Sequence, residues 1–331
     1  MSRYLTPLSV TASLLAGTAM ADAPSVAVDI APVHSLVARV MEGVGTPSLI
    51  VQPGASPHEY SLRPSEAQAL QDADLVFWIG EDLTPWMADA VETLAPDAAV
   101  TALLETDGTT LLSFRNGALF EAHAHDDDHA AHDHDKEHGD DDHDPDHADH
   151  AEGHDDGHDH GDHDPHAWLS PENAANWLTV IAAHLSAADP DNADSYQANA
   201  AAARAEIASL SAEVTATLDT VRGGRFIVFH DAYQYFETAF DFPAFGAISI
   251  SDSSDPSPAR IAEIQGRIAD EGIQCVLSEP QFNPGLVATV MDGAGAKTSV
   301  LDPLGANLET GPDMYPQLLR SLANSLADCL S

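Results

Sequence analysis

The sequence predicts an α/β protein of two lobes, each a parallel sheet flanked by helices, with one long helix joining them. In residues 24–118, and again from residue 223 onward, short apolar runs alternate with helical patterns. Such alternation is typical of parallel strands connected by crossover helices. Between the two halves, a helical pattern continues without interruption from residue 193 to residue 221. The chain of 331 residues is long enough for each lobe to bury its own core.

The first lobe is expected to contain four strands. Helical patterns separate the apolar runs that predict them. We expect strands at residues 25–30, 48–51 and 74–79 and near Val100, with helices after the first strand, around residues 64–72 and from about residue 85 to 94. The order of strand and helix predicts that these strands run parallel.

Two helices are predicted to connect the lobes. The first begins at Ser170, which is followed by a proline and an acid, as at many helix N-termini. Apolar residues then recur at helical spacing: Trp177, Leu178, Ile181 and Leu185. The second, over residues 193–221, is rich in alanine and ends at Gly223-Gly224, and its apolar stripe is Ile207, Leu210, Val214 and Leu218.

The alternation resumes in the second lobe. Strands are expected at residues 226–229, 244–250, 274–277 and 298–301, and helices at 233–239, 257–271, 284–293 and 314–327. The second lobe is therefore predicted to repeat the architecture of the first.

An insert at residues 121–165 separates the first lobe from the connecting helices. It contains 13 His and 19 Asp or Glu residues against one Lys, without hydrophobic periodicity. Such a segment cannot bury enough apolar surface to fold, so we expect a disordered loop. The predicted division is a first lobe at residues 22–120, this loop, connecting helices at 166–222 and a second lobe at 223–331.

The N-terminus has the features of a secretory signal peptide. A short positive start precedes a mostly apolar stretch and the small residues Ala19 and Ala21, which predicts cleavage after residue 21. A membrane anchor is disfavoured because the apolar stretch is short and interrupted by polar residues. No other stretch approaches spanning length and no cysteine directly follows the signal segment, so we expect a soluble periplasmic protein without a lipid anchor.

Composition limits the partners of this chain. The only cysteines, Cys275 and Cys329, are expected to form a disulfide in an exported protein. They lack the close spacing of a zinc site. The net charge of −42 argues against a nucleic-acid partner, because phosphates require lysine and arginine, and it favours cation binding.

Four polar residues are predicted to meet at the cleft between the lobes. In open parallel sheets, ligands bind outside the carboxyl ends of the strands. His58 and His230 each follow a predicted strand, Asp302 follows another, and His166 lies between the insert and the next helix. Three neutral imidazoles and one oxygen suit a tetrahedral Zn²⁺ site. For each single histidine, a polar loop residue is the alternative.

Other residues are weaker candidates for this site. His34 is expected at a helix start and His184 on an exposed helix face. Trp78, Trp86 and Phe229 are expected to form core or cleft wall, and Glu81 and Asp82 a solvated edge.

Five segments resemble the zinc-binding subunits of zinc-uptake ABC transporters, the ZnuA type of periplasmic metal receptor. They are PGASPHEYSLRPS, DPHAWLSP, FHDAYQYF, SEPQFNP and LDPLGAN, and the likeness extends over nearly the whole mature chain, including the His-rich insert and the paired cysteines. The resemblance implies two lobes bridged by a rigid backbone helix. It also implies Zn²⁺ as the transported ligand, held by His58, His166 and His230, and an inner-membrane ABC permease as partner. We expect a monomer.

The fourth ligand is less well determined by this resemblance. The position before the first histidine, an acid in some zinc receptors, is Pro57 here, and Glu59 is expected to point away. In manganese-type relatives an acid matching Asp302 acts with a second acid, but that second position is His230. The set therefore favours Zn²⁺ over Mn²⁺. We expect Asp302 or a water as the fourth ligand, with Asp302 ahead.

The histidines of the insert are predicted to form several weaker zinc sites. Flexible His and Asp side chains supply ligands but lose conformational entropy when they bind. The loop would gather or buffer zinc, or receive it from a periplasmic zinc chaperone. The predicted residues are His123, His125, His129, His132, His134, His138, His143, His147, His150, His154, His158, His160 and His163.

Three alternative functions remain open at this level. A zinc-dependent hydrolase also uses three histidines and a water, but the chain has no HExxH motif and no acid placed as a general base. A receptor for manganese or another metal, or a metal-binding adhesin, would share the predicted fold.

Overall fold

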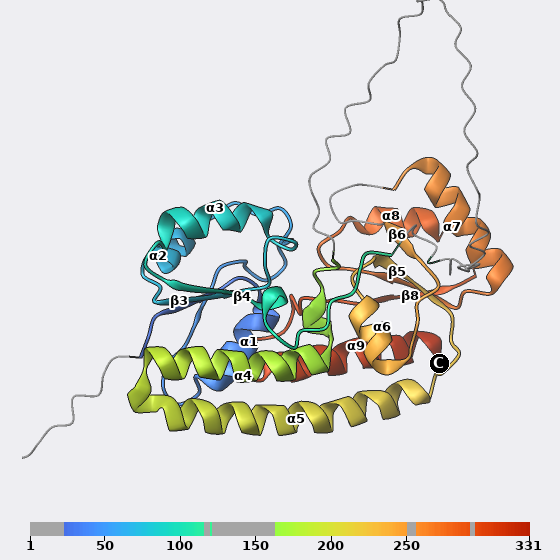
Figure 1. Cartoon of the computed structure of the whole chain (residues 1–331). Coiled ribbons are helices and arrows are strands. Elements are labelled where there is room, and N and C mark those ends of the chain that lie inside the picture. The colour runs from blue at the N-terminus through green and yellow to red at the C-terminus, as the bar shows by residue number, and fades with distance from the viewer. Residues whose placement is uncertain (1–22, 116–119, 121–162, 250–255, 292–294) are drawn as a thin grey trace, which may run out of the picture.

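The computed structural model describes residues 23–115, 120, 163–249, 256–291 and 295–331 (Figure 1). They form two α/β lobes joined by a long helix, which confirms the predicted fold class. The predicted signal peptide and all insert histidines except His163 lie outside the described residues. Within the described part of the chain, no helix is long and apolar enough to cross a membrane.

The first lobe is a four-stranded parallel sheet in the order β2-β1-β3-β4. Each of its helices has a proline in the first turn, where the missing N–H costs no helical hydrogen bond. The elements in chain order are β1 (Val26–Val28), α1 (Ala31–Val40), β2 (Ser48–Leu49), α2 (Pro64–Gln71), β3 (Leu75–Trp78), α3 (Pro85–Leu94) and β4 (Ala99–Ala102), followed by a 3-10 turn at Leu103–Glu105.

The second lobe repeats this topology in the order β6-β5-β7-β8, again with parallel strands. In both lobes the first strand of the lobe lies inside the sheet and the second lies at an edge. The elements are β5 (Phe226–His230), α6 (Gln234–Phe240), β6 (Ala247–Ser249), α7 (Pro258–Glu271), β7 (Cys275–Ser278), α8 (Pro284–Val290), β8 (Lys297–Val300) and α9 (Met314–Leu330).

A layer of long helices lies beneath the two lobes (Figure 1). A 3-10 turn (Ala167–Leu169) leads into α4 (Pro171–Ala188), and a second turn (Pro190–Asn192) leads into α5 (Ala193–Asp219). The Ser170 side chain caps α4 by accepting a hydrogen bond from the backbone N–H of Asn173. Helix α5 packs against α4 under the first lobe and against α9 under the second, so one helix connects both halves.

The inner strands of each sheet, β1 and β3 in the first lobe and β5 and β7 in the second, are buried on both faces, as expected for parallel sheets. Side chains alternate along β3, where Phe77 faces the core shared with the helix layer and Val76 faces the core under α2 and α3. In β5, Val228 faces the shared core and Ile227 the core under α7 and α8. The same alternation fixes the direction in which His230, the last residue of β5, points.

The two cysteines form the predicted disulfide. Cys275 in β7 is bonded to Cys329 in α9, with 5.9 Å between the Cα atoms. Both residues are buried. The bond attaches the last helix to the second sheet.

Candidate metal centre

His58 is carried by the loop between β2 and α2. Gly54 has a φ of 85°, a conformation that glycine adopts without strain, and the chain turns there towards the second lobe. The backbone N–H of His58 donates to Ser56 Oγ at 3.3 Å. The carbonyl of Pro57 accepts a hydrogen bond of 2.7 Å from Nε1 of Trp86 in α3.

His166 is fixed by its neighbour Asp164. The Asp164 carboxylate is 2.7 Å from His166 Nδ1 and accepts the His166 backbone N–H at 3.0 Å. The Tyr235 hydroxyl of α6 donates to the Asp164 carbonyl at 2.9 Å and accepts the backbone N–H of Leu112 at 2.9 Å. His166 is 5% exposed, so its ring is buried as well as bonded.

His230 is fixed in the same way by Glu279. His230 ends β5, and Glu279 directly follows the neighbouring strand β7. Oε1 of Glu279 is 2.8 Å from His230 Nδ1 and 3.3 Å from the backbone nitrogen of His230. Phe282 packs edge-on against the ring, with 5.3 Å between centroids.

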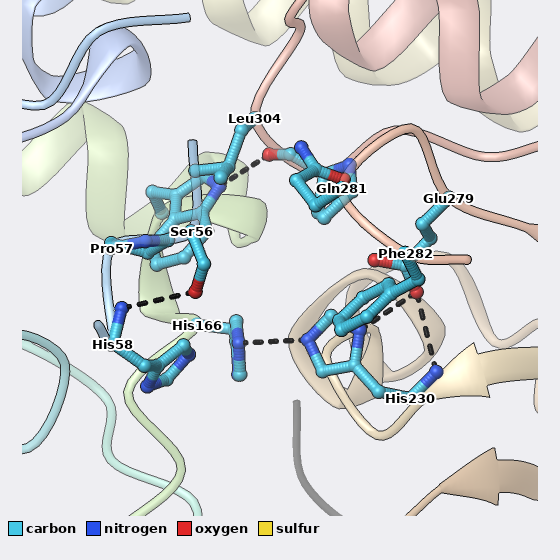
Figure 2. Close-up of a pocket in the computed structure, with 11 residues that line it drawn as sticks. Ser56, Pro57, His58, His166, His230, Glu279, Gln281, Phe282 and Leu304 are labelled. Atoms are coloured by element: carbon cyan, nitrogen blue, oxygen red, sulfur yellow. Dashed lines mark hydrogen bonds and ion pairs between the residues drawn. The ribbon is translucent and has the colours of Figure 1, made fainter. Parts of the chain in front are cut away.

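The three histidines line one pocket between the lobes (Figure 2). The ring centroids are 5.6 Å apart for His58 and His166 and 5.2 Å apart for His166 and His230. The pocket contains about 270 Å³ of space outside the protein atoms. This volume includes space that is open to solvent. The remaining lining residues are Ser56, Pro57, Trp168, Glu279, Gln281, Phe282, Pro303 and Leu304.

The nitrogens of His166 and His230 that face the pocket have the separation of two ligands on one metal ion. Their Nε2 atoms are 3.4 Å apart. An ionised carboxylate can only accept a hydrogen bond, so beside ionised Asp164 and Glu279 each Nδ1 carries the ring proton and leaves Nε2 as the nitrogen that can bind a metal ion. Two nitrogens that bind one tetrahedral Zn²⁺ at about 2.05 Å are about 3.3 Å apart. The carboxylates thus orient both rings to hold a cation between them.

Among the residues that the structure describes, no group of three or more His, Cys, Asp or Glu side chains is arranged to hold a metal ion. His166 and His230 stand at ligand separation, and His58 lines the same pocket.

Burial raises the pKa of both carboxylates. It raises the pKa of Asp164 to about 7, against the lowering effect of the His166 backbone N–H and the Arg115 charge. It also raises the pKa of Glu279, and His230 opposes this shift. A cation between the rings would place a positive charge nearby and lower both pKa values.

The segment before the insert is bonded to the second lobe. Arg115 makes ion pairs with Asp231, the residue after His230, and with Glu237 in α6 at 2.7 Å. The flanks of the insert pair with each other at Ser113 and His163. His163 lies in this bridge next to Asp164. Its zinc binding stays a prediction. His166 is thus attached to the same lobe as His230.

The Asp302 carboxylate is hydrogen-bonded within its own turn and to Gln281, whose Nε2 donates to Oδ1 at 3.4 Å. Its Oδ1 accepts the backbone N–H groups of Leu304 and Gly305 at 3.1 and 2.9 Å, and its Oδ2 accepts that of Ala306 at 2.6 Å. Asp302 is not among the residues that line the pocket. Its role as the fourth ligand stays a prediction, and these three bonds weigh against it.

The other candidate histidines lie elsewhere. His34 is buried in α1, with Nε2 3.1 Å from the Pro47 carbonyl, and burial lowers its pKa. His184 in α4 is bonded to Thr101 at 3.2 Å. Glu59 is exposed.

Two site residues were missed by the sequence reasoning. Asp164 lies at the end of the acidic insert, where its composition hides it, and Glu279 directly follows the predicted strand at residues 274–277 and Ser278. Its position could have indicated a role, because Glu279 follows a predicted strand just as the ligand candidates His230 and Asp302 do.

Comparison with known proteins identifies one family. The family model described as "Zinc-uptake complex component A periplasmic" (ZnuA) matches residues 26–329. The chain is 52% identical over 306 residues to a high-affinity zinc uptake system protein ZnuA of Brucella suis biovar 1, covering 92% of this chain and 91% of the relative. It is 42% identical over 329 residues to the ZnuA protein of Paracoccus denitrificans, covering 98% of each.

Solved structures share the fold. A crystal structure of ZnuA matches with a TM-score of 0.71 at 23% identity, covering 94% of this chain and 100% of the other. A zinc-bound deletion mutant of ZnuA matches with a TM-score of 0.71 at 23% identity, covering 94% and 99%. The periplasmic zinc binding protein TroA of Treponema pallidum has a TM-score of 0.72 at 18% identity, covering 93% and 99%.

Proposed function

Because the chain belongs to the ZnuA family of periplasmic zinc-uptake components, we propose that it binds the Zn²⁺ it carries with His58, His166 and His230. It captures zinc and delivers it to an ABC permease, as the family does. The ion enters the pocket between the lobes and meets two buried nitrogens from the second-lobe side and one histidine from the first lobe.

One observation supports this site above the others, the 3.4 Å separation of the two Nε2 atoms. Without an ion, one of these nitrogens can donate a hydrogen bond to the other, and a bound cation would take the place of that proton. Zn²⁺ satisfies both at its usual bond length. His58 lines the same pocket and supplies the third nitrogen after a small movement of its loop.

The donor set favours zinc over manganese. Imidazole suits Zn²⁺, whereas Mn²⁺ prefers carboxylate and water oxygens. Among the described residues that line the pocket, the carboxylate is that of Glu279, and its Oε1 contacts Nδ1 of His230, so it orients the ligand. A water completes the tetrahedron, and Asp302 is the alternative.

The same geometry argues against hydrolysis at this site. A zinc hydrolase needs a base beside the metal-bound water. Asp164 and Glu279 both lie on the Nδ1 sides of their histidines, away from the position of the ion. This placement and the family of zinc-uptake components support a carrier of the ion rather than a catalyst.

Three further expectations complete the proposal. Residues 1–21 direct export to the periplasm and are removed, and the protein acts there as a monomer. The thirteen histidines of residues 121–165 bind additional zinc more weakly and accept it from a periplasmic chaperone.

Zinc titration against a competing chelator tests the site. H58A, H166A and H230A should each weaken the tight one-to-one complex by more than the roughly 10- to 100-fold typical of an outer partner of a metal ligand. H184A is the matched control, because His184 is bonded to Thr101 outside the pocket. Tight one-to-one binding in H58A and H230A would show that the site is wrong.

A further inference from the structure

One side chain, Trp86, contacts the chain on both sides of His58. Its Nε1 donates to the carbonyl of Pro57 at 2.7 Å, immediately before the histidine. Its ring packs against Tyr60, two residues after the histidine, with 5.7 Å between centroids. Resting on the proposed function, we propose that Trp86 is a positioning residue that sets the approach of His58 to the zinc ion.

The need for such a residue follows from how the pocket is divided. Asp164 and Glu279 fix the rings of His166 and His230, and Tyr235 attaches the His166 segment to the second lobe. His58 alone comes from the first lobe. The distance between His58 and the preformed pair therefore depends on where the first lobe holds the loop after β2.

Trp86 is suited to hold that loop because its own position is fixed. It lies in the first turn of α3, between Pro85 and the fully buried Met87. Its ring is half-buried and packs against the hydrophobic cores of the first lobe. Helix α3 thus fixes the indole, and the indole fixes the backbone next to His58.

The end of the loop has a second attachment, to α2. The Tyr60 hydroxyl donates to Glu66 Oε1 at 2.8 Å, and the Arg63 backbone N–H donates to Glu66 Oε2 at 2.7 Å. This attachment supports the chain after His58, whereas the Trp86 hydrogen bond supports the chain before it. Removal of the indole N–H should therefore loosen His58 without unfolding the loop.

The experiment is a double-mutant cycle between Trp86 and His58, read by zinc titration against a chelator. W86F keeps an aromatic ring beside Tyr60, although a smaller one, and loses the donor to Pro57. We expect W86F to weaken zinc binding about fivefold, the equivalent of one lost hydrogen bond. In the H58A background, the same change should leave the affinity unaltered, because the group that Trp86 positions is gone.

A matched control removes an indole hydrogen bond elsewhere. Trp177 in α4 donates to Thr109 Oγ1 at 2.9 Å and does not line the pocket. W177F should therefore leave the zinc affinity unchanged, whatever it does to the melting temperature. A second measurement is the visible absorption of bound Co²⁺, which reports the number of ligands. The spectrum of W86A should shift towards that of H58A.

The outcomes separate the inference from the proposed function. An equal loss of affinity from W86F in both backgrounds, or no loss in either, would overturn the positioning role while H58A still shows the ligand. Unchanged affinity in H58A itself would overturn the proposed site, and the positioning role with it.

Discussion

The contact between Glu279 and His230 gives the sharpest prediction about the pocket. The change is E279A, which removes the carboxylate 2.8 Å from His230 Nδ1 and leaves the ring free to rotate or to change its tautomer. A hydrogen bond to a charged group contributes about 1.5–3 kcal/mol. Since about 1.4 kcal/mol is tenfold in affinity, the variant should bind zinc roughly 10- to 100-fold more weakly.

The assay is a competition titration of mature protein with a zinc chelator of known affinity. E279Q is the matched variant, because the amide oxygen still accepts from Nδ1–H in a side chain of the same size, so a smaller loss is expected. The melting temperature of the zinc-free variants shows whether they are folded. Zinc affinity of folded E279A within about threefold of the parent would refute the orienting role of this carboxylate.

Four further predictions concern stability and stoichiometry. Burial raises the pKa of Asp29 from 3.8 to about 7, so the folded state binds a proton at Asp29 more tightly than the unfolded state does. This proton contributes to the free energy of unfolding at low pH, and its contribution is lost as the pH rises from about 4 to about 7. In urea unfolding, the stability of D29N relative to the parent should rise by up to about 4 kcal/mol over that range, and a pH-independent difference would contradict this. Replacement of both Cys275 and Cys329 by Ser should lower the unfolding free energy by roughly 4 kcal/mol in denaturant titrations, and an unchanged midpoint would exclude the contribution. D302A should lower the melting temperature because three backbone N–H groups lose their acceptor, with little change in zinc affinity, whereas a loss above about 100-fold would make Asp302 a ligand. Deletion of residues 123–163 should leave one tight zinc equivalent in calorimetry, and several remaining equivalents would contradict the role assigned to the insert.

The sequence predicted the fold class and the three histidines because both depend on local pattern. Each apolar run marks a strand, and the carboxyl ends of parallel strands meet at one edge of a sheet. His58 and His230 follow strands of different lobes, so the cleft between the lobes was the place where they could meet. The structure brings both to the same pocket as His166.

The partners of these histidines depend on long-range register, which the sequence does not display. Strands β5 and β7 are neighbours in the sheet although β6 lies between them in the chain. The register pairs Phe226 with Cys275 and Ile227 with Val276, and its continuation places His230 beside Glu279. The contact between His230 and Glu279 therefore cannot be inferred without the strand order.

The backbone hydrogen bonds of Asp302, in contrast, are indicated by the residues that follow it in the sequence. An aspartate followed by proline and, two residues later, glycine is typical of a turn in which the carboxylate accepts nearby backbone N–H groups. Asp302 makes three such bonds. The turn chemistry of this segment competes directly with metal binding for the same two oxygens.

X-ray absorption at the zinc edge tests most directly whether the preformed histidine pair holds the ion. The sample is mature protein without residues 123–163, loaded with one equivalent of zinc. The predicted spectrum is that of three imidazole nitrogens at about 2.0–2.1 Å and one oxygen, with one imidazole lost in H230A. A shell dominated by oxygen, or an identical spectrum for H230A, would contradict the assignment of the site.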